Sequence, residues 1–443
     1  MFYLLGRCQN GQFYRCQFGI QLKPMRATRD DLLREGKHYK FPRRGSNLLR
    51  AVEERLSAEA NKDEVSALSE IKRGSQVVHL PIDLIFKILL LLPAESLHKA
   101  SFVCKAWFNL INSSNFVEDH LCQCESVLIY RQSVSQRRLD TFSVEAKFGQ
   151  SEEWSMFSRG ERPKYYINFL EVKDGKGKVC ESKISGIKNI LASCNGLILA
   201  TCQQNRGLLV MNPVTRKVII LPLGTLLQRD ESYGFAFCPL TREYKVVHLF
   251  RDESGHIGCE ILNLGMRLWQ AVDGPSFGLF RKFCYKPVAA IGALHWLPSK
   301  QGSNYLVYMG MDDEKFHSRT LPNSSGINDR LVEIGGSLGF VTHVALDRTE
   351  VWILKGLVGG DWLKLHVITS CKIVDLIPLS TLWYGREMIF KGRGDSSFHV
   401  YNFEIEVMRE VEKEGEENYY HHHSSYLPHV HSLATWESLQ SIW

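Results

Sequence analysis

From about Glu125 to the C-terminus, the sequence repeats short apolar runs that are separated by Gly, Asn-Pro or Asp. Residues 207–213 and 218–222 form one such pair of runs, and residues 235–239 and 244–250 form another. Runs of this length between turn residues are typical of β-strands joined by tight turns, and helical periodicity is nearly absent. The long C-terminal part of the chain is therefore predicted to be an all-β domain.

An all-β region of this length needs an architecture that protects the edges of many strands. If about four strands occupy roughly fifty residues, as in a kelch-like blade, the region holds about six blades. Radial repetition leaves only short, protected edges, so a β-propeller is the predicted architecture. A pair of stacked β-sandwiches is the alternative, because the repeats are too degenerate to count.

Composition indicates an intracellular chain with more than one folding unit. The 443 residues are 44% hydrophobic and 23% charged, which supports a sizeable core and excludes a wholly disordered protein. The net charge of +6 is small for this length and does not indicate a nucleic-acid partner. The 12 cysteines are scattered, so no disulfide framework is predicted. No signal peptide or membrane span is predicted, because the apolar runs are too short.

Residues 1–76 are polar and basic, and they are predicted to form a disordered or weakly helical N-terminal arm. Arg43 and Arg44 could form part of a nuclear import signal, and a solvated arm is the simpler interpretation. The chain is expected in the nucleus, the cytoplasm or both.

Between residues 77 and 122, the apolar period changes to that of short helices. Pro81 suits the first turn of a helix and Pro93 is expected to end it. About forty residues with so many apolar side chains make a poor independent globule. They predict a helical surface that a partner helix completes, or a helical cap on the rest of the chain.

Five blocks in this helical segment form a specific pattern. They are Leu80-Pro-Ile-Asp-Leu84, Ile88-Leu89, Leu92-Pro93, Ser96-Leu97 and Val103-Cys-Lys-Ala-Trp107. In this order and at this spacing, they resemble the F-box of plant F-box proteins, over about residues 77–121. The region that follows is similar to the F-box-associated interaction domain of the same family. Its matching features are Ser193–Leu197, Asn212-Pro213 with Thr215, Gly234-Phe235 and Tyr244–Val247.

The resemblance implies the substrate receptor of an SCF-type cullin ubiquitin ligase. It implies a three-helix F-box at 77–122 that docks a Skp-type adaptor and, through it, a cullin. A β-rich domain at 123–443 would hold an unknown protein substrate for ubiquitination and proteasomal degradation. Such a receptor needs no catalytic residue, because it acts by raising the effective concentration of the substrate. The adaptor-binding residues that the resemblance implies are Leu80, Pro81, Ile85, Ile88, Leu89, Leu92, Pro93, Leu97, Val103, Cys104, Lys105 and Trp107.

Four positions depart from the usual F-box pattern. Lys87 stands where an acid is frequent, and Leu91 where an arginine is common. Ala100 and Ser101 replace a frequent aromatic residue and a frequent arginine. We expect these changes to alter charge at the rim of the adaptor contact rather than its apolar centre. Trp107 could be an anchor of that contact or a brace within the helices.

Other residue types could carry chemistry, and each has a simpler interpretation. His421–His423, with His429 and His431, could bind a metal, but an exposed flexible loop is favoured. Cys122 and Cys124 are too close together for a zinc knuckle. The sequence contains no recognisable catalytic motif, so no cofactor or metal is predicted. The alternatives to a ligase receptor are a binding module that acts outside a cullin ligase and a propeller enzyme.

Overall fold

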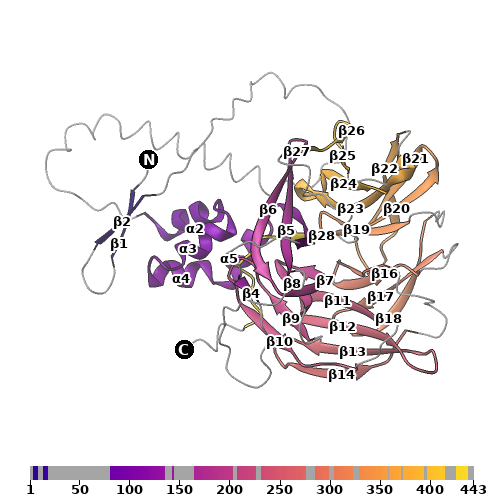
Figure 1. Ribbon diagram of the computed structural model, residues 1–443, viewed down its shortest axis with the longest axis horizontal. Helices are drawn as coiled ribbons and strands as arrows, with labels where there is room; N and C mark the ends of the chain where they lie inside the picture. The colour runs from indigo at the N-terminus through magenta and orange to yellow at the C-terminus, as the bar shows by residue number, and fades with distance from the viewer. Residues whose placement is uncertain are drawn as a thin grey trace. The chain divides into compact units, whose positions relative to one another are not determined.

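The computed structural model describes most residues from 80 onward, together with two short N-terminal strands (Figure 1). The described ranges are 3–7, 13–17, 80–134, 142–143, 164–202, 207–225, 231–275, 285–298, 304–322, 329–357, 359–370, 373–393, 397–414 and 426–437. The chain divides into two compact units, Met1–Ile88 and Leu89–Trp443. Arg43, Arg44 and His421–His423 lie outside the described residues.

The first unit contains a hairpin of β1 (Tyr3–Arg7) and β2 (Phe13–Gln17), which pair antiparallel. These strands occupy part of the arm for which no sheet was expected. The unit also contains most of helix α2 (Ile82–Leu90), because the boundary between the units lies within that helix. The remainder of the predicted arm lies outside the described residues.

The region predicted to be an F-box forms four short helices rather than three. They are α2 (Ile82–Leu90), α3 (Ala94–Ala100), α4 (Lys105–Ile111) and α5 (Ser114–Leu121). The amide of Asn112 donates to the carbonyl of Phe108 at 2.8 Å and so ends α4. The hydroxyl of Ser113 then accepts from the backbone N–H of Phe116 at 3.4 Å and begins α5. Asn112 and Ser113 therefore divide this part of the chain into two helices, although its apolar spacing suggests a single helix.

Five antiparallel sheets of four consecutive strands follow, and we number them blades 2 to 6. Blade 2 contains β7 (Ile187–Cys194), β8 (Leu197–Cys202), β9 (Leu208–Met211) and β10 (Val218–Leu221). Blade 3 contains β11 (Glu231–Cys238), β12 (Glu243–Arg251), β13 (Ile257–Asn263) and β14 (Leu268–Val272). Blade 4 contains β15 (Val288–Ala290), β16 (Ala293–Trp296), β17 (Tyr305–Gly310) and β18 (Phe316–Thr320).

The last of these sheets is both preceded and interrupted by a single turn of 3₁₀ helix. Blade 5 contains β19 (Arg330–Ile334), β20 (Ser337–Ala345), β21 (Arg348–Leu354) and β22 (Trp362–Thr369). Blade 6 contains β23 (Leu376–Leu382), β24 (Glu387–Gly392), β25 (Phe398–Asn402) and β26 (Val407–Glu410). The 3₁₀ turns are η1 (Ile373–Asp375) and η2 (Trp383–Gly385).

Blade 1 is built from both ends of the β region. Its strands are β3 (Ser126–Val134), β4 (Phe142–Ser143), β5 (Lys164–Lys173), β6 (Lys176–Ser185), β27 (Glu412–Glu414) and β28 (Leu427–Val430). The strand order is β27-β6-β5-β3-β28, and β4 also pairs with β6. In Figure 1, yellow β28 accordingly lies among the purple and magenta strands of blade 1. Pro428 is tolerated because β28 pairs on one side only, with β3.

The inner strands of the six blades form a closed ring. Strands β7, β11, β15, β19, β23 and β28 contact one another in this cyclic order, and β28 returns to β7. This closure confirms the predicted six-bladed propeller and excludes the stacked β-sandwiches. Asp313 and Asp347 both lie in turns between strands, where aspartate is favoured.

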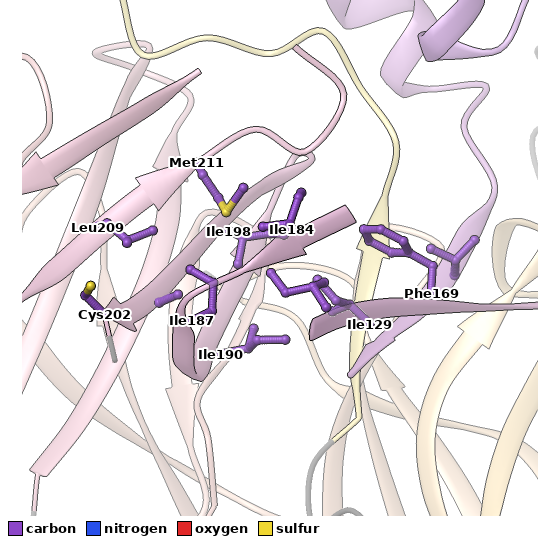
Figure 2. Close-up of a cluster of buried hydrophobic side chains, with 12 residues drawn as sticks. Ile129, Phe169, Ile184, Ile187, Ile190, Ile198, Cys202, Leu209 and Met211 are labelled. Atoms are coloured by element: carbon purple, nitrogen blue, oxygen red, sulfur yellow. The ribbon is translucent and has the colours of Figure 1, made fainter. Parts of the chain in front are cut away.

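The hydrophobic core lies between neighbouring blades, with one buried cluster at each of the six interfaces. Figure 2 shows the cluster between blades 1 and 2, where Ile129 and Phe169 lie close to Ile187, Ile198 and Met211. Because successive side chains of a strand point to opposite faces, each blade contributes to two clusters. The core is therefore continuous around the ring.

A hairpin of the same geometry joins the third and fourth strands of blades 2, 3 and 6. Asn212, Asn263 and Asn402 each accept, through Oδ1, a backbone N–H two residues later at 2.8–2.9 Å. Four residues after each asparagine, the backbone has a positive φ of 54–60°. A left-handed residue closes such a hairpin, and asparagine side chains favour its first turn. These hairpins are the clearest internal repeat of the propeller.

Acid is expected to destabilise the protein through His295 of β16. This side chain is completely buried, its Nδ1 lies 3.2 Å from the carbonyl oxygen of Val288, and burial lowers its pKa to about 4. An unfolded chain binds a proton here near pH 6.5, so the free energy of unfolding falls as the pH drops from about 6.5 towards 4. His295→Gln should remove about 3 kcal/mol of this pH dependence.

Urea denaturation at pH 7 and pH 4.5 tests the expectation for His295. His317→Gln is the matched control, because His317 lies on the next strand pair of the same blade with an exposed side chain. It should leave the pH dependence within about 0.5 kcal/mol of the wild type. An equal pH dependence in His295→Gln and the wild type would contradict the assignment.

No helix in the described part of the chain is long and apolar enough to cross a membrane.

Candidate functional site

Helix α2 presents apolar side chains to solvent. The carbonyl of Pro81 accepts from the backbone N–H groups of Leu84 at 3.0 Å and Ile85 at 3.2 Å, so Pro81 starts the helix as predicted. Pro93 in turn precedes α3 and accepts from the N–H of Leu97 at 3.0 Å. The exposed large apolar residues in or beside α2 are Leu80, Ile82, Leu84, Ile88 and Leu91.

The twelve residues predicted to bind an adaptor differ in exposure. The exposed ones are Leu80, Pro81, Ile88, Pro93 and Lys105, and the half-buried ones are Ile85, Leu92, Val103, Cys104 and Trp107. Leu89 and Leu97 are only 1% and 0% exposed, so they belong to the chain's own core. These two residues can support a docking surface but cannot be its contact side chains.

Five exposed apolar residues were missed by the sequence-based assignment. They are Ile82, Leu84, Leu91, Phe102 and Phe108. Leu91 and Phe102 are the most exposed of them, each at 72%. In the sequence, Leu91 stands out only as a departure from the F-box pattern, because apolar type alone does not distinguish a surface residue from a core residue. The turns at 91–92 and 101–103 decide which side chains point outward.

The expectation that Ala100 and Ser101 alter the charge at the rim of the adaptor contact is wrong. Both residues are buried, and the Ser101 hydroxyl donates to the carbonyl of His98 at 2.7 Å. Small side chains at these positions allow the end of α3 to pack closely, so they replace no exposed charge. Lys87 and Leu91 are exposed and are the two departures that can change the surface.

Helix α5 and the linker that follows it are attached to the propeller. Val117 packs against the core cluster between blades 2 and 3. Glu118 forms an ion pair with Arg242, in the turn between β11 and β12. The hydroxyl of Tyr384, in the turn between β23 and β24, donates to the carbonyl of Gln123. Helix α5 and its linker therefore contact the end of the propeller where the first and second strands of each blade are joined.

A partly buried polar network strengthens this attachment. Cys124 Sγ donates to the carbonyl of His431 at 3.2 Å and lies 3.4 Å from Nδ1 of His120. His120 Nε2 lies 2.9 Å from the carbonyl oxygen of Leu92, and His431 Nδ1 lies 3.5 Å from Glu95 Oε1. Burial raises the pKa of the Cys124 thiol to about 12 and lowers the pKa of His120. The thiol thus stays protonated and acts as a structural donor.

His429 and His431 do not lie in an exposed flexible loop, so that expectation is corrected. His429 is 2% exposed on the closing strand β28, and its Nδ1 lies 2.8 Å from the Ser193 hydroxyl. Burial lowers the pKa of His429 well below its usual value. The reason is topological, because ring closure draws this segment into the core. Among the described residues, no group of three potential metal ligands comes together.

Helices α3–α5 are attached to a ring of six blades, and helix α2 carries exposed apolar side chains. Comparison with known families agrees with both parts. Residues 78–119 match the F-box domain, and residues 143–432 match the F-box associated beta propeller domain. Since the second match covers more than half of the chain, the protein belongs to the F-box associated β-propeller family.

Similar curated proteins come from Arabidopsis thaliana. F-box protein CPR1 is 24% identical over 330 residues, covering 67% of this chain and 74% of that protein. F-box/kelch-repeat protein At3g23880 is 22% identical over 339 residues, covering 73% and 88% of the two chains. Similarity to solved structures is low. TolB from Acinetobacter baumannii has a TM-score of 0.39 at 11% identity, covering 60% of this chain and 62% of that one.

Proposed function

We propose that this protein is the substrate-recognition subunit of an SCF-type cullin ubiquitin ligase. Its F-box would dock a Skp-type adaptor and thereby a cullin. Its propeller would hold a target protein for ubiquitination and proteasomal degradation, in the nucleus or the cytoplasm. The chain would act without catalysis, by raising the effective concentration of its target. The domain division after residues 76 and 122 is part of this proposal.

The exposed apolar residues of the F-box region carry the proposal. Burying one large aliphatic or aromatic side chain contributes about 1.5–3 kcal/mol. Several of them support a tight interface even after association costs are subtracted. A partner that covers them removes an apolar exposure that a soluble chain otherwise rarely carries. The residues are Leu80, Ile82, Leu84, Ile88, Leu91, Phe102 and Phe108.

Co-purification with a Skp-type adaptor tests the docking step. Leu91→Glu/Phe102→Glu is expected to weaken adaptor binding at least about 100-fold, because two charges replace two apolar contacts. Neither side chain is part of the core, so the unfolding temperature should change little. Leu240→Glu/Leu346→Glu is the matched control, because these propeller leucines are 75% and 78% exposed. Equal adaptor recovery with all three proteins would refute docking through these residues.

A reconstituted ubiquitination assay tests the remaining steps. The wild type is expected to bring the cullin into the complex through the adaptor, and the Leu91→Glu/Phe102→Glu variant is not. A wild-type chain that holds the adaptor but never recruits a cullin would instead be a binding module outside a ligase.

A further inference from the structure

Basic residues from several blades lie at one end of the propeller, where inner strands begin. Arg131 of β3 donates through Nη1 to the backbone carbonyl of Lys188, near the start of β7. Lys286, just before β15, donates through Nζ to the carbonyl of Ile190 at 2.6 Å. The Arg330 guanidinium, at the start of β19, lies 4.0 Å from the ring centroid of Tyr285. These contacts place Lys188, Lys286 and Arg330 in one arc along the inner strands, which we call the basic arc.

The basic arc lies at the opposite end of the propeller from helix α5 and its linker. Lys188 and Arg330 stand where their inner strands begin, and Lys286 stands just before one. Arg242 and Tyr384, which contact α5 and its linker, stand in turns that follow inner strands. Because the inner strands of a propeller run in the same direction, the two sets of residues lie at opposite ends. A ligand at the basic arc would leave the helices accessible to an adaptor.

The acidic residues at this end of the propeller offset only part of the positive charge of the basic arc. Glu231 accepts from the hydroxyl of Tyr233 at 3.0 Å and lies 3.6 Å from His248 Nε2. Asp329 accepts from the hydroxyl of Thr342 at 2.7 Å. Asp375 is exposed. Among the described residues, no carboxylate forms an ion pair with Lys188, Lys286 or Arg330.

We propose that the basic arc is the substrate-recognition site and binds an acidic peptide segment of the target protein. This inference rests on the proposed function, because it assigns the substrate class of the same receptor. A segment that carries carboxylates or phosphoryl groups can reach successive cations on neighbouring inner strands. The Arg330 guanidinium suits bidentate contact with such groups. The chain's net charge is only +6, so local placement rather than overall charge makes this end attractive to an anion.

The surroundings of Lys286 support the assignment. Its side chain is exposed to solvent, and the protein atoms packed around its ammonium group lower the pKa to about 8 by partly removing the charged form from water. A charge in such surroundings attracts an anion more strongly than one in bulk water. Tyr285 beside it is exposed and offers an aromatic surface to a peptide side chain.

Fluorescence polarisation with labelled probes tests the proposal on the full chain. The probes are an octaglutamate peptide, a Gly-Ser octapeptide with two phosphoserines, an octaglutamine peptide, an octalysine peptide and a single-stranded oligonucleotide. We expect an anionic peptide to bind and the neutral and basic peptides not to bind. Binding should weaken as salt rises, because the contacts are ionic. The two anionic peptides distinguish carboxylate from phosphate recognition.

Two double variants localise the binding. Lys188→Gln/Arg330→Gln is expected to weaken binding of the anionic peptide at least about tenfold, since it removes two charge-assisted contacts. Lys315→Gln/Lys355→Gln is the matched control. It removes the same two charges from exposed positions in turns between third and fourth strands, at the other end of the propeller. The control should bind as tightly as the wild type.

The outcomes separate this inference from the proposed function. Adaptor recovery should be unchanged in Lys188→Gln/Arg330→Gln. If the wild type binds neither anionic peptide, if both double variants weaken binding equally, or if the oligonucleotide binds more tightly than either peptide, the inference is overturned. Adaptor docking would then still stand on its own test. Conversely, a chain that fails to dock the adaptor would still be expected to bind the anionic peptide.

Discussion

A chain that ends at residue 425 is expected to lose its single cooperative unfolding transition. Such a chain lacks β28, the inner strand of blade 1, which pairs with β3 from Leu427↔Ile129 to Val430↔Ser126. Without it, β3 gains an open edge and the contacts that join β28 to β7 and β23 disappear. The expected loss is at least about 5 kcal/mol, comparable with the whole stability of a typical domain.

Thermal and urea denaturation measure this loss, and a peptide added in trans controls for it. A synthetic peptide of residues 426–437 should restore part of the transition of the shortened chain, because it supplies the missing strand. A peptide of the same composition in scrambled order should not. A shortened chain that unfolds at the wild-type temperature would show that β28 does not close the ring.

Asn212→Ala is expected to lower the free energy of unfolding by about 3 kcal/mol, because it leaves buried polar groups without partners. Asn212 is completely buried, and its Nδ2 donates to the carbonyls of Ser432 at 3.0 Å and Ala434 at 2.9 Å. The Ser432 hydroxyl also donates to the carbonyl of Asn195 at 2.6 Å. We call residues 431–437 the C-terminal strap, and Asn212 fastens it to blade 2.

Two further variants distinguish the contribution of the strap to stability from the contribution of the hairpin turn. Asn402→Ala removes the equivalent hairpin asparagine of blade 6, whose Nδ2 donates to Glu387 rather than to a strap. It should cost about 1–2 kcal/mol, less than Asn212→Ala, because the turn N–H groups that it leaves are exposed to water. Asn212→Asp keeps the Oδ1 acceptor of the turn but loses the donor to the strap. It should be at least as destabilising as Asn212→Ala, since a carboxylate oxygen would face two carbonyls.

Urea denaturation gives the free energies, and limited proteolysis reports the strap directly. Cleavage within 431–437 should accelerate in both Asn212 variants and not in Asn402→Ala. Glu437→Gln removes only the exposed ion pair with Lys217 and should change stability by less than about 1 kcal/mol. Equal losses in Asn212→Ala and Asn402→Ala would contradict a role for the strap.

Much of the propeller could be predicted because its hairpins are local. The runs at 235–239 and 244–250 correspond to β11 and β12, which pair in register from Glu231↔Phe250 to Cys238↔Glu243. The alternating apolar residues and the turn residues between them lie within about twenty residues of sequence, so local patterns are enough to predict the hairpin. The helical period of α2 is visible for the same reason.

The closing strand could not be predicted in this way. Strand β28 is only four residues long and contains Pro428 and His429, so it lacks the apolar alternation of a strand. Its partners are provided by β3, about three hundred residues earlier in the chain. The burial of His429 could not be predicted for the same reason, because it follows from ring closure and not from the residues next to it in sequence.

The residues expected to dock an adaptor are only partly exposed in the structure. The family resemblance named Leu80 and Ile88, which are exposed, and also Leu89 and Leu97, which are buried. It omitted Phe102, which lies in a turn where helical phase carries no information. Short helices of seven to nine residues reorient at each turn, so their outward faces depend on how they pack.

The sequence by itself determined the division into a helical segment and a β-rich region, because each period is a property of neighbouring residues. It also carried the family resemblance through blocks of local sequence. The tertiary structure alone decided which apolar residues face outward, how β28 closes the ring and how Asn212 holds the strap across 220 positions. It also brought Lys188, Lys286 and Arg330 to one end of the propeller. These features join segments that are distant in sequence, and only the closed ring places them side by side.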